Sequence, residues 1–167
     1  MKNILVVKAN NRPDGISTKM YETFMAGVEN TEGLNVSTFD VFAENLAYFG
    51  QDLFNAFGKM QNGEELTAIE QASVESMNKA REALTPADIV VFAFPLWNQT
   101  IPAALQSFID YTYGAGYSFK YDEQGQLVSL MTDKKYIVLN ARGGNYSNPA
   151  MAPMEMAVNY INNVIGG

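Results

Sequence analysis

Three segments of the sequence carry side chains suited to binding a flat cofactor that bears one phosphate. The first, NNRPDGISTK, leads into a helical pattern, and the free N–H groups and positive dipole at a helix start attract phosphate. Ser17 and Thr18 add hydroxyl groups, and Lys19 adds a positive charge. The segment matches neither GxxxxGK[ST] nor GxGxxG, which disfavours NTP hydrolysis and a Rossmann dinucleotide site. An ordinary helix start is the alternative reading of this segment taken alone.

The other two segments offer an aromatic ring, an amide and a flexible backbone. PLWNQTIP contains Trp97, the only tryptophan, which could stack on a planar ligand or meet its edge. Asn98 beside it can both donate and accept hydrogen bonds. ARGGNYS contains Arg142, which could pair with an acid or an anion, and Gly143 and Gly144, which permit positive φ and close approach to a ligand. The plain alternatives are a tryptophan that covers the end of a sheet and a simple glycine turn.

Composition removes several other kinds of chemistry. The chain has 167 residues and a formal charge of -7, and it contains neither Cys nor His. We therefore expect no disulfide, no thiol nucleophile, no Ser-His-Asp triad and no metal centre. The acidic balance disfavours nucleic acid and anionic lipid as partners. No apolar run reaches about 18 residues, so no membrane span is expected. The opening MKNILVVKANNRPDG resembles a strand more than a signal peptide, which makes the cytoplasm the expected location.

Hydrophobic patterns predict alternating strands and helices within a single domain of residues 1–167. Short runs rich in Val, Ile and Phe predict buried strands over residues 3–8, 34–42, 88–94 and 135–140. Apolar residues at helical spacing predict helices over residues 17–28, 66–84, 101–113 and 153–165. A β-hairpin is expected in residues 117–131, with its turn at Gln124-Gly125. Residues 43–65 are too long for a plain connection, which predicts a functional or partly helical segment.

Local signals refine three of these helices. Ser17 is the expected N-cap of the first helix, and Pro153 is expected to open the last one, where a missing N–H costs nothing. Glu70 is expected on the solvated face of the second helix. The buried stripe expected in that helix consists of Leu66, Ile69, Ser73, Met77, Ala80 and Leu84.

The alternation of elements predicts an α/β fold with a parallel sheet and helices on both of its faces. In such a sheet, ligands bind beyond the carboxyl ends of the strands, where the strand order reverses. The loops after the first, third and fourth strands, at residues 9–19, 95–100 and 141–148, therefore lie at one edge. The three candidate segments belong to these loops, which makes their combination more specific than any one of them.

These motifs together resemble the FMN-dependent NADH-azoreductases, also called NADH:quinone oxidoreductases, of the flavodoxin-like superfamily. The resemblance runs from Met1 to about Ile165 and is carried by ILVVKAN, DGISTKMYETF, FPLWNQTIPAALQSFID, GAGYSFKY and NARGGNYS. It implies a flavodoxin-like three-layer sandwich with strand order 2-1-3-4. The family sheet continues to a fifth strand, whereas this sequence ends after the helix at residues 153–165. We therefore expect a domain that is short at its C-terminus, with an exposed edge at residues 136–140.

The resemblance also implies a cofactor and a reaction. FMN would be bound without a covalent link, NADH would deliver hydride to its N5 atom, and quinones or aromatic azo compounds would accept the electrons. Azo compounds would be cleaved to amines. No side chain is expected to be catalytic, because the flavin carries the chemistry. The residues that would bind FMN are Asn10, Ser17, Thr18, Lys19, Pro95, Leu96, Trp97, Asn98, Gln99, Ala141, Arg142, Gly143 and Gly144.

Within this cofactor site, the resemblance assigns the phosphate to the first loop and the isoalloxazine to the second. The third loop would approach the pyrimidine end of the ring. Members of the family are homodimers with two active sites at the interface, so residues 43–65 would border the partner's flavin. Two other readings stay open. One is a flavodoxin-type FMN electron carrier, whose acidic surface would suit a basic redox partner. The other is an inactive truncated fragment of the reductase.

Overall fold

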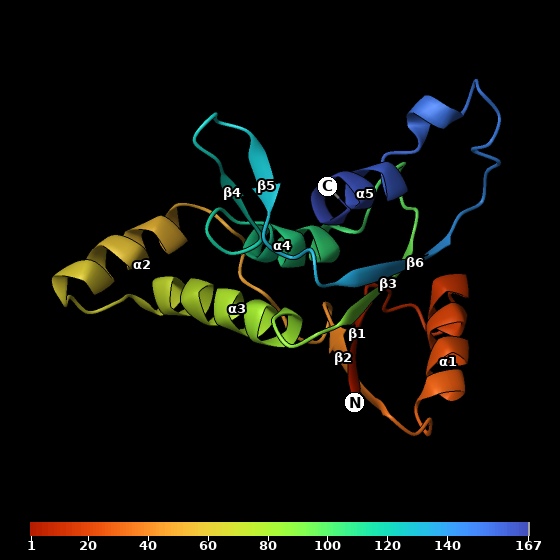
Figure 1. Ribbon diagram of the computed structural model, residues 1–167, viewed down its shortest axis with the longest axis horizontal. Coiled ribbons are helices and arrows are strands. Elements are labelled where there is room, and N and C mark those ends of the chain that lie inside the picture. The colour runs from red at the N-terminus through yellow and green to blue at the C-terminus, as the bar shows by residue number, and fades with distance from the viewer. Residues whose placement is uncertain (167) are drawn as a thin grey trace.

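A computed structural model describes residues 1–166 and has strands and helices in alternation (Figure 1). The strands are β1 (Lys2–Lys8), β2 (Leu34–Asp40), β3 (Ile89–Pro95), β4 (Phe119–Tyr121), β5 (Leu127–Ser129) and β6 (Lys135–Ala141). The helices are α1 (Ile16–Val28), α2 (Gln51–Asn62), α3 (Ala68–Leu84), α4 (Ala103–Thr112) and α5 (Val158–Ile165), with a 3₁₀ turn over Ala152–Met154. The expected strands and helices are therefore present.

The main sheet is parallel and has the order β2-β1-β3-β6, as predicted. Val6 of β1 lies opposite Val91 of β3, which in turn lies opposite Ile137 of β6. Residues 4–7 of β1 and 90–95 of β3 are hidden from solvent, which explains the apolar runs in these central strands. β4 and β5 form the predicted hairpin as a separate antiparallel pair, and Gly125 in its turn has a φ of 75°.

Helices cover both faces of the sheet, which gives the expected three layers (Figure 1). α1 covers one face, where Phe24 packs against Ile4, Val6 and Val91. The other face carries the larger core, to which α3, α4 and α5 contribute. The edge strand β6 is less covered than its neighbours, and Ile137 on the α1 side is 42% exposed. In residues 1–166, no helix has both the length and the apolar character needed to cross a membrane.

α2 packs against α3, and together they form an arm that projects from the sheet (Figure 1). Residues 43–65 are thus partly helical, as predicted. The prediction for Glu70 is wrong, because its side chain lies between the two helices. One of its oxygens is 2.9 Å from Lys59 Nζ and accepts the N–H of Thr67, which caps α3. Ile69, expected in the buried stripe, is instead 58% exposed, because α2 packs on the neighbouring side that carries Glu70.

Two helix starts also differ from the prediction. Gly15 is the N-cap of α1, and Ser17 lies buried in the first turn, where its hydroxyl accepts a hydrogen bond from Asn10. Pro153 opens only a single 3₁₀ turn. The chain is then extended at Glu155, and this residue's carboxylate accepts the N–H groups that begin α5. The two starts differ in kind, because no side chain caps the free N–H groups of α1, whereas the Glu155 carboxylate satisfies those of α5.

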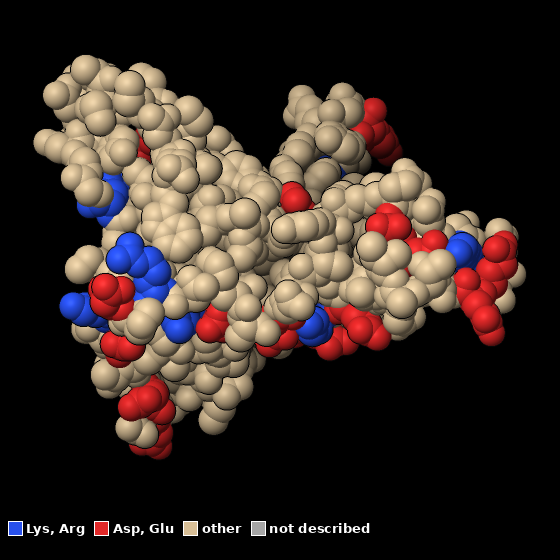
Figure 2. Space-filling model, turned by 180° about the vertical axis from the view of Figure 1, so that it is seen from behind, with Lys and Arg blue, Asp and Glu red and all other residues tan. Residues whose placement is uncertain are grey.

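Charge is unevenly spread over the face seen from behind (Figure 2). Acidic side chains gather along the lower edge and at the far end of the arm. The upper left of this view, over residues 143–154 after β6, is largely without charge, whereas the β4–β5 hairpin carries Lys120, Asp122 and Glu123.

Candidate functional site

A hollow of about 520 Å³ opens at the carboxyl ends of β1, β3 and β6. This volume is in the range of about 300–1,000 Å³ that small-molecule sites usually have. The three loops expected to meet at this edge of the sheet all contribute to it. The hollow is lined by Asn10, Arg12, Gly15, Ile16, Ser17, Met20, Pro95, Leu96, Trp97, Asn140, Ala141, Arg142 and Gly143.

The first loop forms a hydrogen-bonded cradle at the start of α1. Asn10 is buried, donates from Nδ2 to the Ser17 hydroxyl over 2.7 Å, and accepts the Arg12 N–H over 2.9 Å. The Thr18 hydroxyl donates to the Arg12 carbonyl over 2.7 Å. In residues 1–166 the N–H groups of Ile16, Ser17 and Thr18 have no protein acceptor. These free donors and the helix dipole make the cradle suited to an anion such as phosphate.

Gly15 allows the cradle to close tightly. A Cβ atom at this position would lie 2.5 Å from Asn10 Nδ2 and 3.2 Å from the carbonyl oxygen of Arg12. Real Cβ atoms essentially never come as near as the first of these distances. Any residue larger than glycine would therefore have to displace the Asn10 amide.

The second loop is a tight turn at the end of β3. The N–H and carbonyl of Trp97 pair with those of Thr100, both over 3.1 Å. Asn98 and Gln99 between them have φ values of 51° and 70°, so the turn is of type I′. Trp97 is half-buried, lines the hollow and meets Phe42 edge-on at 6.4 Å between ring centroids. An aromatic side chain thus forms part of the wall of the hollow.

The third loop follows β6 and is joined to the second, because the Leu96 N–H donates to the Ala141 carbonyl over 2.8 Å. Gly143 has open space where its Cβ would be. Gly144 packs against Tyr146, whose ring would lie 3.0 Å from an added Cβ. Neither glycine has a positive φ, so their relevance here is close approach rather than an unusual backbone.

Five of the residues assigned to the cofactor site from the sequence lie beside the hollow rather than on its lining. Thr18 is buried behind the first loop and supports it. Lys19 faces a neighbouring apolar groove between α1 and Leu139. Asn98 and Gln99 form the exposed tip of the turn, and Gly144 lines an adjoining polar pocket that also includes Arg142. The remaining eight line the hollow itself.

Sequence reasoning missed five lining residues, which are Arg12, Gly15, Ile16, Met20 and Asn140. Gly15 had a usable signal, since a glycine directly before a helix that binds an anion allows close approach of the backbone. Arg12 brings a second positive charge to the rim, although Asp14 lies 3.7 Å from it. No such signal exists in the sequence for Ile16, Met20 or Asn140, because their place in the lining depends on how the elements pack together.

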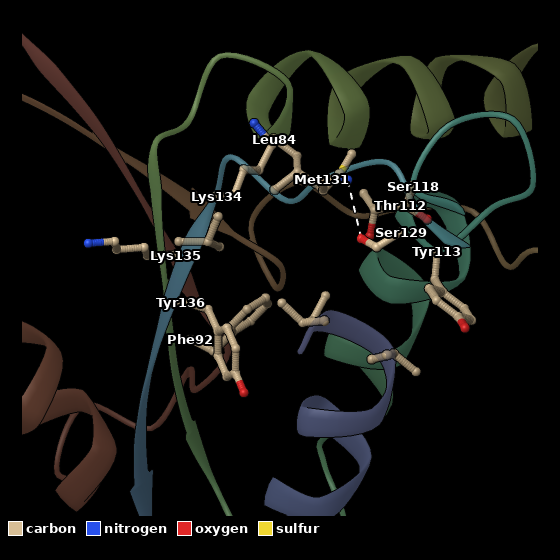
Figure 3. A pocket seen from close by; sticks show the side chains of 13 residues that line it. Leu84, Phe92, Thr112, Tyr113, Ser118, Ser129, Met131, Lys134, Lys135 and Tyr136 are labelled. Atoms are coloured by element: carbon tan, nitrogen blue, oxygen red, sulfur yellow. Dashed lines mark hydrogen bonds between the residues drawn. The ribbon is translucent and has the colours of Figure 1, made fainter. Parts of the chain in front are cut away.

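A narrower cavity of about 40 Å³ lies at the opposite, amino-terminal end of the strands (Figure 3). Leu84, Phe92, Met131 and Tyr136 are among the side chains that surround it, and Lys135 points away from it. A single water molecule needs about 10–15 Å³ of such space, so this cavity suits a few solvent molecules and not an aromatic cofactor. The hollow at the carboxyl ends is the candidate site, because all three loops meet there.

Comparison with known proteins agrees with this fold and site. The model of a family described as having a flavodoxin-like fold matches residues 2–166. An FMN-dependent NADH:quinone oxidoreductase of Brevibacillus brevis is 46% identical, over 99% of this chain and 81% of its own length. The crystal structure of an azoreductase from Bacillus anthracis is 44% identical with a TM-score of 0.87, over 99% of this chain and 81% of that one.

A second Bacillus anthracis structure is similar at lower identity. It is an FMN-dependent NADH-azoreductase in complex with FMN, 25% identical with a TM-score of 0.86. The alignment covers 99% of this chain and 82% of that one. The fold similarity therefore extends across nearly all of the chain, including each of the three loops.

Proposed function

The chain belongs to the family with the flavodoxin-like fold, and we propose that it is an FMN-dependent NADH:quinone oxidoreductase that also reduces aromatic azo compounds. The observation that carries this proposal is the meeting of three distinct loops around one hollow. A helix start rich in free donors, a turn with an aromatic ring and a glycine loop face the same space. Relatives that are 46% and 43% identical over 99% of this chain are named FMN-dependent NADH:quinone oxidoreductases.

The residues present fit FMN. We assign the phosphate to Asn10, Ser17 and the free N–H groups that begin α1, with Arg12 as a nearby counter-charge. Thr18 and Lys19 support this loop and add charge beside it. The glycine at position 15 leaves room for close approach of the backbone.

The ring is assigned to the second and third loops. Pro95, Leu96 and Trp97 would form its wall, and Asn98 and Gln99 would offer N–H groups at the tip of the turn. Ala141, Arg142, Gly143 and Gly144 would lie along the pyrimidine end. When bound, FMN supplies the transfer of hydride from NADH and of electrons to the acceptor. The contribution of the chain is to orient the ring and to keep both of its neighbouring loops in place.

An FMN titration of the purified chain tests the proposal. Retention of about one flavin per chain after desalting is expected, measured by visible absorbance. Oxidation of NADH should then depend on both added FMN and a quinone, and an azo dye should lose its colour under the same conditions. A chain that binds FMN but does not oxidise NADH would instead act as an electron carrier. A chain that melts cooperatively but retains no flavin would contradict the site assignment.

We further propose that the chain forms a homodimer in which residues 43–65 border the partner's active site. This segment exposes several apolar side chains, including Tyr48 at 86%, Phe54 at 53% and Met60 at 54%. A groove of about 440 Å³ lies beside them, between residues 41–48 and the start of α4. Exposed apolar patches of this kind usually mark contact surfaces.

Sedimentation equilibrium tests this assembly. The wild-type chain should sediment as a dimer, and Phe54→Ser should shift it towards a monomer, because the substitution removes an exposed apolar contact. Ile137→Thr is a suitable control, since Ile137 is also an exposed apolar residue, at 42%, but lies on β6. A wild-type chain that is monomeric at all concentrations would contradict the proposal.

We also propose a cytoplasmic location for the chain, which the proposed use of NADH as electron donor supports.

A further inference from the structure

The segment Glu155–Ala157, between the 3₁₀ turn and α5, touches both loops that flank the hollow. On one side, Glu155 Oε1 lies 3.4 Å from a guanidinium nitrogen of Arg142. On the other, the N–H of Met156 donates to the carbonyl of Gln99 over 2.9 Å. The Ala157 side chain is completely buried in the core. One short and well-anchored segment thus connects the loop after β3 to the loop after β6.

Glu155 is held in place by the start of α5. Its side chain is 8% exposed, and Oε1 accepts the N–H groups of Ala157 and Val158 over 3.2 and 2.8 Å. Oε2 accepts the N–H of Asn159 over 3.2 Å. The free donors of the helix and the dipole both stabilise this carboxylate. Its position is therefore set by the helix rather than by Arg142.

Arg142 is held by three different neighbours. Besides Glu155, its Nε donates to Asn140 Oδ1 over 2.8 Å, and its guanidinium lies over the Tyr146 ring at 5.4 Å. Asn140 is in turn fixed to β3, since Nδ2 donates to the Phe94 carbonyl over 3.0 Å. These contacts orient the first residues of the third loop. They also place a carboxylate beside the one positive side chain that this loop brings to the hollow.

We propose that Glu155 is a positioning residue for the cofactor site. Its carboxylate orients Arg142 and, by fixing the start of α5, keeps the Met156 N–H against Gln99. Both loops that flank the flavin ring therefore depend on one anchor. Glu155 also compensates the charge of Arg142 near the ring. This inference rests on the proposed function for the identity of the ligand, but the anchoring itself can be measured without it.

The substitution Glu155→Gln tests the anchor with little change in shape. Gln keeps one acceptor oxygen for the N–H groups of Ala157 and Val158, but its amide nitrogen cannot accept the Asn159 N–H, so it caps α5 more weakly, and it cannot neutralise Arg142. In the flavin-free chain, amide hydrogen exchange should accelerate in residues 96–100 and 141–147. FMN affinity should fall about tenfold, which corresponds to 1.4 kcal/mol. The midpoint potential of bound flavin should become more positive, because an uncompensated positive charge favours the more negatively charged reduced form.

Glu70→Gln is a matched control for this experiment. Glu70 is also a buried carboxylate that caps a helix and pairs with a cation, Lys59, at 2.9 Å. It lies at the junction of α2 and α3, away from the hollow. Both variants should melt at a lower temperature than the wild type. Only Glu155→Gln should change FMN affinity, midpoint potential and exchange in the two loops.

A second variant keeps the inference testable if Glu155→Gln does not fold. Arg142→Gln leaves the cap of α5 and the contact from Met156 to Gln99 intact. Exchange should then accelerate in residues 141–147 but not in 96–100. Unchanged exchange in 141–147, or equal acceleration in both loops, would overturn the proposed route through Arg142. Equal effects of Glu155→Gln and Glu70→Gln on FMN affinity would overturn the positioning role.

The two proposals fail in different ways. If the wild-type chain retains no FMN, the proposed function fails, while exchange in the flavin-free variants still reports on the anchor. If the wild type binds FMN and the Glu155→Gln variant binds it equally well with unchanged exchange, the anchor fails and the function stands.

Discussion

Replacement of Gly15 by alanine should weaken FMN binding while leaving the fold intact. The new Cβ would lie 2.5 Å from Asn10 Nδ2, and ordinary contact begins at 3.4 Å. The Asn10 amide would therefore have to move by about 0.9 Å to relieve the overlap. Its hydrogen bond to the Ser17 hydroxyl is 2.7 Å long, so a shift of this size would break or strongly bend it.

The size of the effect follows from that hydrogen bond. Loss of one partner of a buried polar pair costs about 1–3 kcal/mol. The free chain can relieve the clash through the exposed residues 11–14, whereas bound phosphate requires the undistorted cradle. We therefore expect most of the cost in the FMN dissociation constant, which should rise about 5- to 150-fold. Gly15 has a φ of -68°, which alanine tolerates, so backbone strain adds nothing to this expectation.

Fluorescence titration with FMN measures the change, and Gly27→Ala provides the control. Gly27 lies in the same helix and has no heavy atom within 4 Å of an added Cβ. That variant should be slightly more stable, by up to about 1 kcal/mol, and should bind FMN as the wild type does. Gly15→Ala with an unchanged dissociation constant would refute the assignment of the phosphate to the first loop.

Three further predictions concern other parts of the molecule. Trp97 emission should be quenched on addition of FMN, and unchanged emission at saturation would argue against its place beside the ring. Gly143→Val should hinder approach of the ring with little change in the melting temperature, because the space around Gly143 is open; equal FMN affinity would count against the third loop. The hydrogen bond from Lys59 lowers the pKa of Glu70, so its contribution to stability is present above about pH 4.3 and lost as the pH falls through the lowered value. The difference in melting temperature between wild type and Glu70→Gln should therefore shrink in acid, and a constant difference would contradict the ion pair.

The sequence predicts those elements whose burial leaves a regular pattern along the chain. Residues 4–7 of β1 and 90–95 of β3 are buried between the two helical layers, so both segments are wholly apolar. The helix starts were less predictable, because the N-cap of α1 is a glycine without a side-chain hydrogen bond and the N–H groups that begin α5 are accepted by Glu155, which precedes that helix. Asn10 replaces Ser17 as the side chain that organises the start of α1, and Lys59 draws Glu70 inward.

The candidate site was also predictable in part: its position in the fold was predictable, but not all of the side chains that line it. Topology alone brings the three loops to one edge of the sheet, since the carboxyl ends of parallel strands lie together. Which side chains face the hollow depends on details that no periodicity reveals. The positive φ values of Asn98 and Gln99 turn these residues to the exposed tip of the second loop. Glu155 could not be connected to Arg142 from spacing, because the pairing depends on where α5 begins.

The left-handed turn at Asn98 and Gln99 has a thermodynamic consequence for ligand capture. Each residue at positive φ costs about 1–3 kcal/mol, and the turn persists because Trp97, Thr100 and Met156 hold its backbone. This cost is met once, when the chain folds, and is not repeated when a ligand arrives. Association should therefore involve little loss of conformational entropy from this turn. Its heat-capacity change should reflect only the apolar surface that the ligand buries, without a contribution from ordering a loop.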